Sequence, residues 1–114
     1  MIVKTRDGMV RLSIDRILYA QLCHRSVVYY LNNGETVESV QIRTSFPEAM
    51  RELLENEGFL MCGAGTVANL HYITMVDKEG VLFKNHTRLY LSKKACTELR
   101  SVWYDYWFEG EGSR

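Results

Sequence analysis

The sequence predicts a mainly β fold of small antiparallel sheets, with one amphipathic helix on the side and a second helix near the C-terminal end. Three observations predict it. Short runs in which apolar and polar residues mix are separated by turn residues, which is typical of strands joined by hairpins. One run between residues 46 and 57 has apolar residues at helical spacing, and a second helical run follows Ser92.

The first 42 residues are expected to form strands. Asp7 and Gly8, a strong turn pair, separate the segments IVKT and MVRL, which predicts a hairpin. A second turn is predicted from Asn32 to Gly34, between two apolar-rich runs. The strands of this part are expected at residues 2–5, 9–12, 17–22, 26–31 and 35–42.

A helix is predicted from Phe46 to Glu57. Ser45 and Glu48 have the spacing of a capping box, and Pro47 stands in the first turn, where its missing N–H is not needed. Gly58 is expected to end the helix. The apolar residues recur at helical spacing on one face: Phe46, Ala49, Met50, Leu53 and Leu54.

The second half of the chain returns to strands and ends in a helix. Strands are expected at residues 59–61, 71–76, 81–84 and 88–91, and residues 62–66 are small and flexible. Ser92 is expected to cap the last helix, which runs to about Phe108. The candidate core face of this helix consists of Cys96, Leu99, Trp103 and Tyr106.

The composition fits one globular domain. The chain has 114 residues, of which 46% are hydrophobic and 25% charged, so we expect a single domain at residues 1–108 and a frayed polar tail at residues 109–114. Lys and Arg number 14, as do Asp and Glu, so the net charge neither indicates nor excludes a nucleic-acid partner. Without a long apolar run or a secretory signal, we expect a cytoplasmic protein with no membrane contact.

No pattern for catalysis or for a metal site is present. Cys23, Cys62 and Cys96 show no CxxC spacing, and no pair of histidines has HxxxH spacing, so we expect reduced thiols and no metal. The sequence contains no glycine-rich nucleotide loop and no meaningful Ser-His-Asp arrangement. We therefore expect no cofactor and no enzymatic activity.

Three stretches resemble the LytTR-type DNA-binding domain, the output domain of a class of bacterial response regulators. They are Ile17 to Gln21 (ILYAQ), Phe59 to Cys62 (FLMC) with Val67 to Ile73 (VANLHYI), and Leu91 to Lys94 (LSKK). The predicted helix at residues 46–57 stands where that family has its long amphipathic helix. The resemblance covers about residues 2–99 and keeps the order and spacing of the motifs.

This resemblance implies an elongated fold whose loops bind DNA without a recognition helix. The loops would enter successive major grooves at an imperfect direct repeat in a promoter. It further implies a receiver domain in the full-length protein, as in two-component systems. A homodimer is expected separately, from the aromatic residues between Trp103 and Phe108. Double-stranded DNA is the expected partner.

The resemblance carries three groups of site residues onto this chain. The first DNA-facing loop corresponds to His24, Arg25 and Ser26, the second to Gly63, Ala64 and Gly65, and the opening of the last helix to Lys93 and Lys94. Arg25 is expected to bind a phosphate or a guanine edge, and the lysines are expected to bind phosphates. Each group also has an interpretation without DNA contact. The first would be a solvated hairpin tip at His24 and Arg25, and the last would be two exposed lysines, Lys93 and Lys94, in a first helical turn.

The second loop departs from the family pattern. Where the family has His-Arg-Ser, this chain has Gly63, Ala64 and Gly65, whose backbone N–H groups read no sequence. An alternative function follows from this loss, from the zero net charge and from the aromatic residues between Trp103 and Phe108. In that alternative, a LytTR-fold module has lost specific DNA reading and serves protein–protein interaction or dimerisation.

Overall fold

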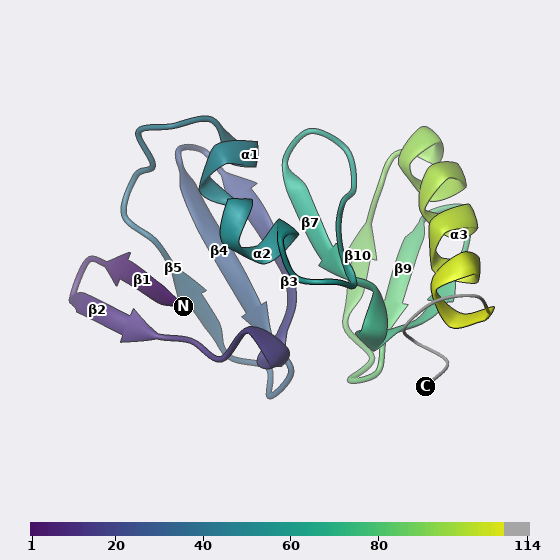
Figure 1. Cartoon of the computed structure of the whole chain (residues 1–114), viewed down its shortest axis with the longest axis horizontal. Helices are drawn as coiled ribbons and strands as arrows, with labels where there is room; N and C mark the ends of the chain where they lie inside the picture. The colour runs from purple at the N-terminus through teal and green to yellow at the C-terminus, as the bar shows by residue number, and fades with distance from the viewer. Residues whose placement is uncertain (109–114) are drawn as a thin grey trace.

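The computed structural model describes residues 1–108 and arranges them as three antiparallel sheets with helices on their sides (Figure 1). The molecule is elongated, with extents of 40 × 28 × 25 Å along its principal axes. The predicted mainly β fold is confirmed. The polar tail predicted at residues 109–114 lies outside the described residues.

Five strands form the central sheet. Their order across the sheet is β5 (Thr36–Glu38), β4 (Ser26–Leu31), β3 (Ile17–Cys23), β7 (Thr66–Asn69) and β6 (Phe59–Met61). All neighbours are antiparallel. Strand β7 was not among the predicted strands, because Ala68 and Asn69 have low strand propensity and the whole strand is buried without alternation. The strand predicted at residues 35–42 keeps regular pairing only over β5.

Two smaller sheets lie at the two ends of the long axis (Figure 1). The first is the predicted hairpin, formed by β1 (Ile2–Thr5) and β2 (Gly8–Arg11). Its turn residues are Arg6 and Asp7, one residue earlier than the predicted Asp7 and Gly8, because Gly8 pairs with Thr5 as the first residue of β2. The second is a three-stranded sheet of β8 (Ile73–Val76), β9 (Gly80–Phe83) and β10 (Arg88–Tyr90), with β9 in the middle. The predicted strand at residues 71–76 therefore begins two residues late, since η2 (Leu70–Tyr72) precedes it.

Two hydrophobic cores lie on the two faces of the central sheet. The first core packs the sheet against the β1–β2 hairpin and the helices α1 and α2, and includes Ile17, Tyr29, Phe46, Met50 and Leu53. The second core packs it against the three-stranded sheet and the last helix, and includes Leu18, Tyr19, Phe83, Leu89 and Leu99. Strand β3 contributes to both cores, which is why its first four residues are all buried.

The predicted helix at residues 46–57 is present as two short helices and ends at Leu54, three residues before the predicted end. α1 (Phe46–Ala49) and α2 (Arg51–Leu54) are separated by Met50, whose φ and ψ of −93° and 6° leave the helical region. The predicted cap is present, since Ser45 Oγ accepts a hydrogen bond from the Glu48 amide at 3.3 Å. The break leaves the apolar face intact, because Met50 itself is buried in the first core.

The last helix, α3 (Lys93–Phe108), begins and ends as predicted. Ser92 Oγ accepts from the Ala95 amide at 3.1 Å and so caps it. Cys96 and Leu99 are buried, and Trp103, half-buried, donates from its indole N–H to the Ile73 carbonyl at 3.2 Å. Within residues 1–108, no helix is long and apolar enough to cross a membrane.

Candidate nucleic-acid interface

The three segments predicted to contact DNA reach the same edge of the molecule, the upper edge in Figure 1. β3 runs towards this edge and β4 leads away from it, so their turn lies there. The β6–β7 loop and the first turn of α3 lie on the same edge. We call it the loop edge, defined by residues 24–26, 63–65 and 93–94.

The β3–β4 turn is a tight hairpin whose tip residues are exposed. His24 adopts a left-handed backbone conformation with φ of 57°, and Cys23 pairs with Ser26 across the turn. The side chains of His24 and Arg25 are exposed, whereas Ser26 is half-buried. The turn therefore presents a guanidinium and an imidazole to solvent on a rigid support.

The segment from Ser39 to Thr44 lies against this turn. The Ile42 amide donates to the Arg25 carbonyl at 2.7 Å, and Ser39 Oγ accepts from the Val27 amide at 2.9 Å. Arg43 directly follows Ile42 and is exposed. The structure thus brings a further cation, Arg43, beside the β3–β4 turn. The sequence did not indicate this, because the hydrogen bond between Ile42 and Arg25 joins residues 17 positions apart in the chain.

The β6–β7 loop lies directly beside the β3–β4 turn. The Leu22 amide donates to the Gly65 carbonyl at 2.8 Å, and a Cβ added to Gly65 would lie 3.3 Å from Leu22 Cβ. Gly63 has φ of 83°, a conformation that glycine adopts freely. Gly63 and Ala64 are exposed, so this middle segment of the loop edge offers backbone N–H groups and no charge.

The start of α3 carries two exposed lysines. Lys94 Nζ is 4.0 Å from Glu98 Oε1, and both side chains are largely exposed, so this pair contributes little and leaves the lysine accessible. Two cations at a helix N-terminus are mildly unfavourable because the helix dipole is positive there. An anionic partner would relieve this unfavourable interaction.

Unlike the cations of the loop edge, the basic residues Lys84 and Arg88 interact with side chains of the protein itself. Arg88 Nη2 lies 2.6 Å from Asp77 Oδ2, and Asp77 Oδ1 accepts from the amides of Glu79 and Gly80. The hydrogen bond from Arg88 lowers the pKa of Asp77 below its usual value. Arg88 is therefore an internal partner of the β8–β9 turn, and Lys84 extends over the Tyr72 ring at 5.9 Å.

The three cysteines are free thiols, as predicted. Cys23 is exposed, whereas Cys62 and Cys96 are buried. Burial raises the pKa of Cys62 to about 11, so this group stays protonated at neutral pH. A protonated, buried thiol packs as a small apolar side chain.

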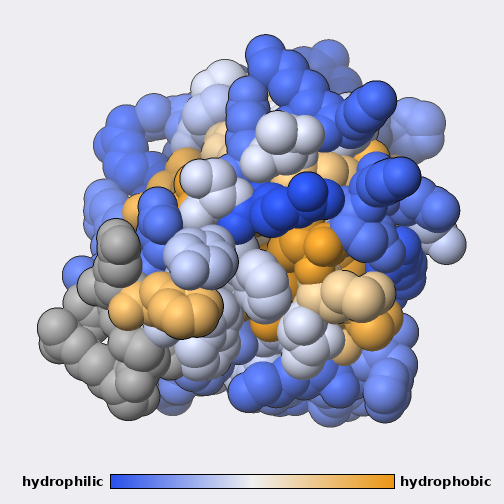
Figure 2. Space-filling model, turned by 90° about the vertical axis from the view of Figure 1, so that its right-hand side faces the viewer, coloured by the Kyte–Doolittle hydropathy of each residue, from blue (hydrophilic) through white to orange (hydrophobic). Residues whose placement is uncertain are grey.

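The aromatic residues of α3 divide between core and surface. Trp103 and Tyr106 pack against the second core. Tyr104 and Phe108 are 54% and 68% exposed and stack on each other, with ring centroids 4.4 Å apart. Figure 2 shows this side of the molecule, where hydrophobic residues gather below a hydrophilic upper part.

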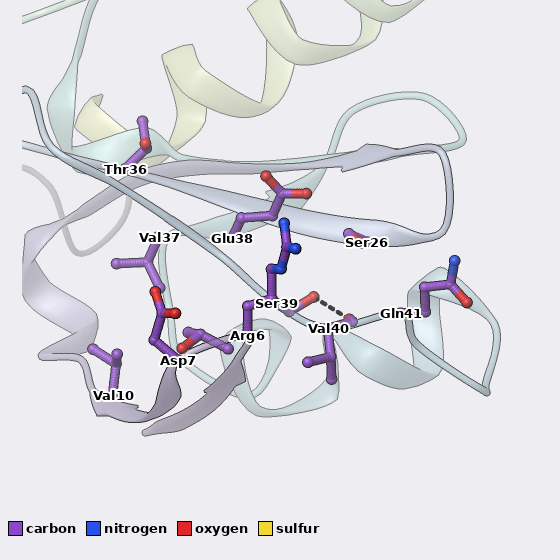
Figure 3. Close-up of a pocket in the computed structure, with 11 residues that line it drawn as sticks. Arg6, Asp7, Val10, Ser26, Thr36, Val37, Glu38, Ser39, Val40 and Gln41 are labelled. Carbon is purple, nitrogen blue, oxygen red and sulfur yellow. Dashed lines mark hydrogen bonds between the residues drawn. The ribbon is translucent and has the colours of Figure 1, made fainter.

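A cavity of about 630 Å³ lies between the β1–β2 hairpin and the edge of the central sheet (Figure 3). Arg6 extends from the hairpin turn towards Glu38 on β5, and Ser39 Oγ donates to the Val40 carbonyl at 2.8 Å. Its lining combines both signs of charge, from Arg6, Asp7 and Glu38.

Comparisons with known proteins agree with this architecture. The sequence profile of the LytTr DNA-binding domain matches residues 7–103. Among solved structures, the chain is similar to the LytTr DNA-binding domain of a protein described as a methyl-accepting/DNA response regulator from Bacillus cereus. That match has a TM-score of 0.68 at 15% identity and covers 90% of this chain and 94% of the other. Comparison with curated proteins finds no significant match.

The profile match extends over most of the chain, and the match in structure supports the same fold. The matched family is one of DNA-binding domains and not of enzymes. The chain therefore belongs to the LytTr DNA-binding domain family.

Proposed function

We propose that this chain binds double-stranded DNA in bacterial transcription regulation, and that residues 1–108 act as one LytTR domain. The observation that carries the proposal is family membership combined with exposed cations on two of the three segments of the loop edge. Following the family resemblance, we assign the two basic ends of the loop edge, the β3–β4 turn and the start of α3, to successive major grooves on one face of a duplex.

Each group of residues has a distinct role in this proposal. Arg25 binds a phosphate or the O6 and N7 atoms of a guanine, since its planar fork suits both. His24 and Ser26 donate hydrogen bonds to the backbone near that contact. Lys93 and Lys94 bind phosphates as point charges.

The middle loop has a positional role. Gly63, Ala64 and Gly65 let the DNA backbone approach closely and donate backbone N–H groups to phosphate oxygens, without reading bases. We therefore infer that a large share of this domain's affinity for DNA does not depend on the base sequence. Its specificity comes chiefly from Arg25 and from the shape of the DNA.

The wider setting belongs to the same proposal. The chain acts as the output part of a two-component response regulator in the bacterial cytoplasm, and a receiver domain in the full-length protein controls it. Two copies bind the two halves of a promoter direct repeat, which raises the affinity through effective concentration.

The experiment is a titration of duplex DNA at two salt concentrations. We expect affinity to rise as salt falls, because binding to phosphates releases counterions. The double variant Lys93→Ala/Lys94→Ala should lower the slope of log affinity against log salt by about 1.8, or about 0.9 for each lost contact. Undetectable affinity for any duplex at 50 mM salt would contradict the proposal.

A second candidate function is protein–protein interaction or dimerisation through α3. The stacked, exposed rings of Tyr104 and Phe108 favour it, together with an apolar groove of about 270 Å³ between them and β8. Sedimentation equilibrium tests it: a dimer that Phe108→Ser converts to a monomer supports the candidate. A strict monomer at high protein concentration counts against it.

A further inference from the structure

A second group of basic residues lies beside α3, where the helix meets the β8–β9 turn, next to the loop edge. A cavity of about 250 Å³ is lined by Lys78, Lys93, Cys96, Thr97 and Arg100. Residues 93, 97 and 100 have the spacing of one helix face, and Lys78 comes from the β8–β9 turn. Two parts of the chain that are distant in sequence therefore bring three cations around one cavity.

The β8–β9 turn is fixed against the start of α3. The Leu91 amide donates to the Glu79 carbonyl at 2.9 Å, which attaches the turn to the residue just before the helix cap. Asp77 Oδ1 accepts from two amides of the same turn at 2.9 and 3.1 Å. Lys78 is therefore presented from a rigid turn, which lowers the entropy cost of using it as a ligand.

The carboxylates around this cavity are engaged with other cations. Asp77 is paired with Arg88, and the charge of Glu79 also acts on Arg88. Glu98 lies nearest to Lys94. Within the described residues, the lining of the cavity contains no acidic side chain. Three like charges around a cavity without a counter-charge repel one another, and an anion in the cavity would remove that repulsion.

We propose that this cavity binds a phosphate of the DNA backbone, so that the duplex continues past the N-terminus of α3 along its outer face. The inference rests on the DNA-binding function proposed above and extends it to Lys78 and Arg100, which the family motifs do not include. Figure 2 shows that the upper part of this side of the molecule is hydrophilic and continuous with the loop edge. Arg100 binds the phosphate with its fork, while Lys78 and Lys93 supply point charges.

Matched variants test the proposal. The double variant Lys78→Met/Arg100→Ala should lower the salt slope by about 0.9, the value for one phosphate contact, which reduces the change in affinity between 50 and 200 mM salt about 3.5-fold. Lys78→Met and Arg100→Ala should each lower the slope by part of this amount. Arg100→Lys should retain most of the slope. The controls are Lys84→Met and Arg16→Ala, which remove exposed cations that belong neither to the loop edge nor to the lining of the cavity and should leave the slope unchanged.

The results separate a failure of the phosphate site from a failure of the proposed function. If the unaltered protein binds DNA and Lys78→Met and Arg100→Ala match the controls, the phosphate site is wrong while the proposed function stands. If the unaltered protein binds no DNA, both fail. All four substituted side chains are exposed, so thermal unfolding is expected to show folded variants.

NMR provides a second measurement that distinguishes DNA from a free anion. Titration with duplex should shift the backbone amides of residues 78, 97 and 100 in addition to those of the loop edge. Shifts confined to residues 24–26, 63–65 and 93–94 would overturn the proposal. Shifts at residues 78 and 100 with inorganic phosphate, but not with duplex, would assign the cavity to a free anion and would also overturn it.

Discussion

The Leu22 amide donates a hydrogen bond to the Gly65 carbonyl at 2.8 Å, and this bond joins the two neighbouring loops of the loop edge. The same contact explains the glycine, because a Cβ at position 65 would lie 3.3 Å from Leu22 Cβ. Leu22 Cβ is attached directly to the backbone of β3, so it has little freedom to move away. The spacing between the β3–β4 turn and the β6–β7 loop is therefore set by a residue without a side chain.

Replacing this glycine should destabilise the fold. For Gly65→Ala, crowding against Leu22 should exceed the gain from a less flexible unfolded chain, leaving a net loss of about 1 kcal/mol in the free energy of unfolding. Urea denaturation measures the loss, with the exposed Ala64→Ser as control. An unchanged free energy would mean that β3 and β7 separate without cost.

Restoring a charge to the middle loop should strengthen DNA binding. Ala64 is exposed between the two basic ends of the loop edge, so Ala64→Arg adds a phosphate contact and should raise the salt slope by about 0.9. Asn33→Arg, at the exposed β4–β5 turn on the opposite edge, is the matched control. If the two variants change the salt slope equally, only the net charge of the protein matters. That result would contradict the assignment of the loop edge as the DNA-binding surface.

Stability and DNA affinity should change in opposite directions at the start of α3. Lys93→Gln removes an exposed cation from a helix N-terminus, which should raise the free energy of unfolding by about 0.3 kcal/mol at low salt. The same variant should bind DNA more weakly. Thermal unfolding and a DNA titration under one buffer condition measure both effects, and a loss of stability would argue against the dipole explanation.

Acid should weaken the β8–β9 turn. The hydrogen bond from Arg88 lowers the pKa of Asp77 in the folded state, so its stabilising effect is complete above the unfolded value, about 3.9. The effect is lost as the pH falls through the lower, folded value. Tm measured from pH 6 to pH 2.5 should therefore fall less for Asp77→Asn than for the unaltered chain. Parallel curves would refute the role of this pair.

Local signals in the sequence predicted local features of the fold. The β1–β2 hairpin follows from Asp7 and Gly8, and the caps of α1 and α3 follow from Ser45 and Ser92. Asn69 accepts from the His71 amide at 3.1 Å and also donates to the Ile17 carbonyl at 3.0 Å. The first of these contacts spans two residues of chain and was foreseeable, whereas the second spans 52 and was not.

Local motifs likewise identify only part of the candidate site. The motif positions identified residues 24–26, 63–65 and 93–94, while Arg43, Lys78 and Arg100 carry no motif. In the proposed interface they join these residues through the Ile42–Arg25 hydrogen bond and through the packing of the β8–β9 turn on α3. Neither contact has a periodic signature, so hydropathy could not reveal it.

By itself, the sequence determined the fold class, most of the strands, the helix caps and the family, because these depend on alternation, turn chemistry and motifs within a few residues. Only the tertiary structure decided that β7 is a central strand, that Met50 divides the lateral helix and that the basic segments reach one edge. Those features depend on burial and on strand pairing between distant residues, such as Gln21 with Thr66. Their free energy comes from contacts that exist only once the two cores have formed.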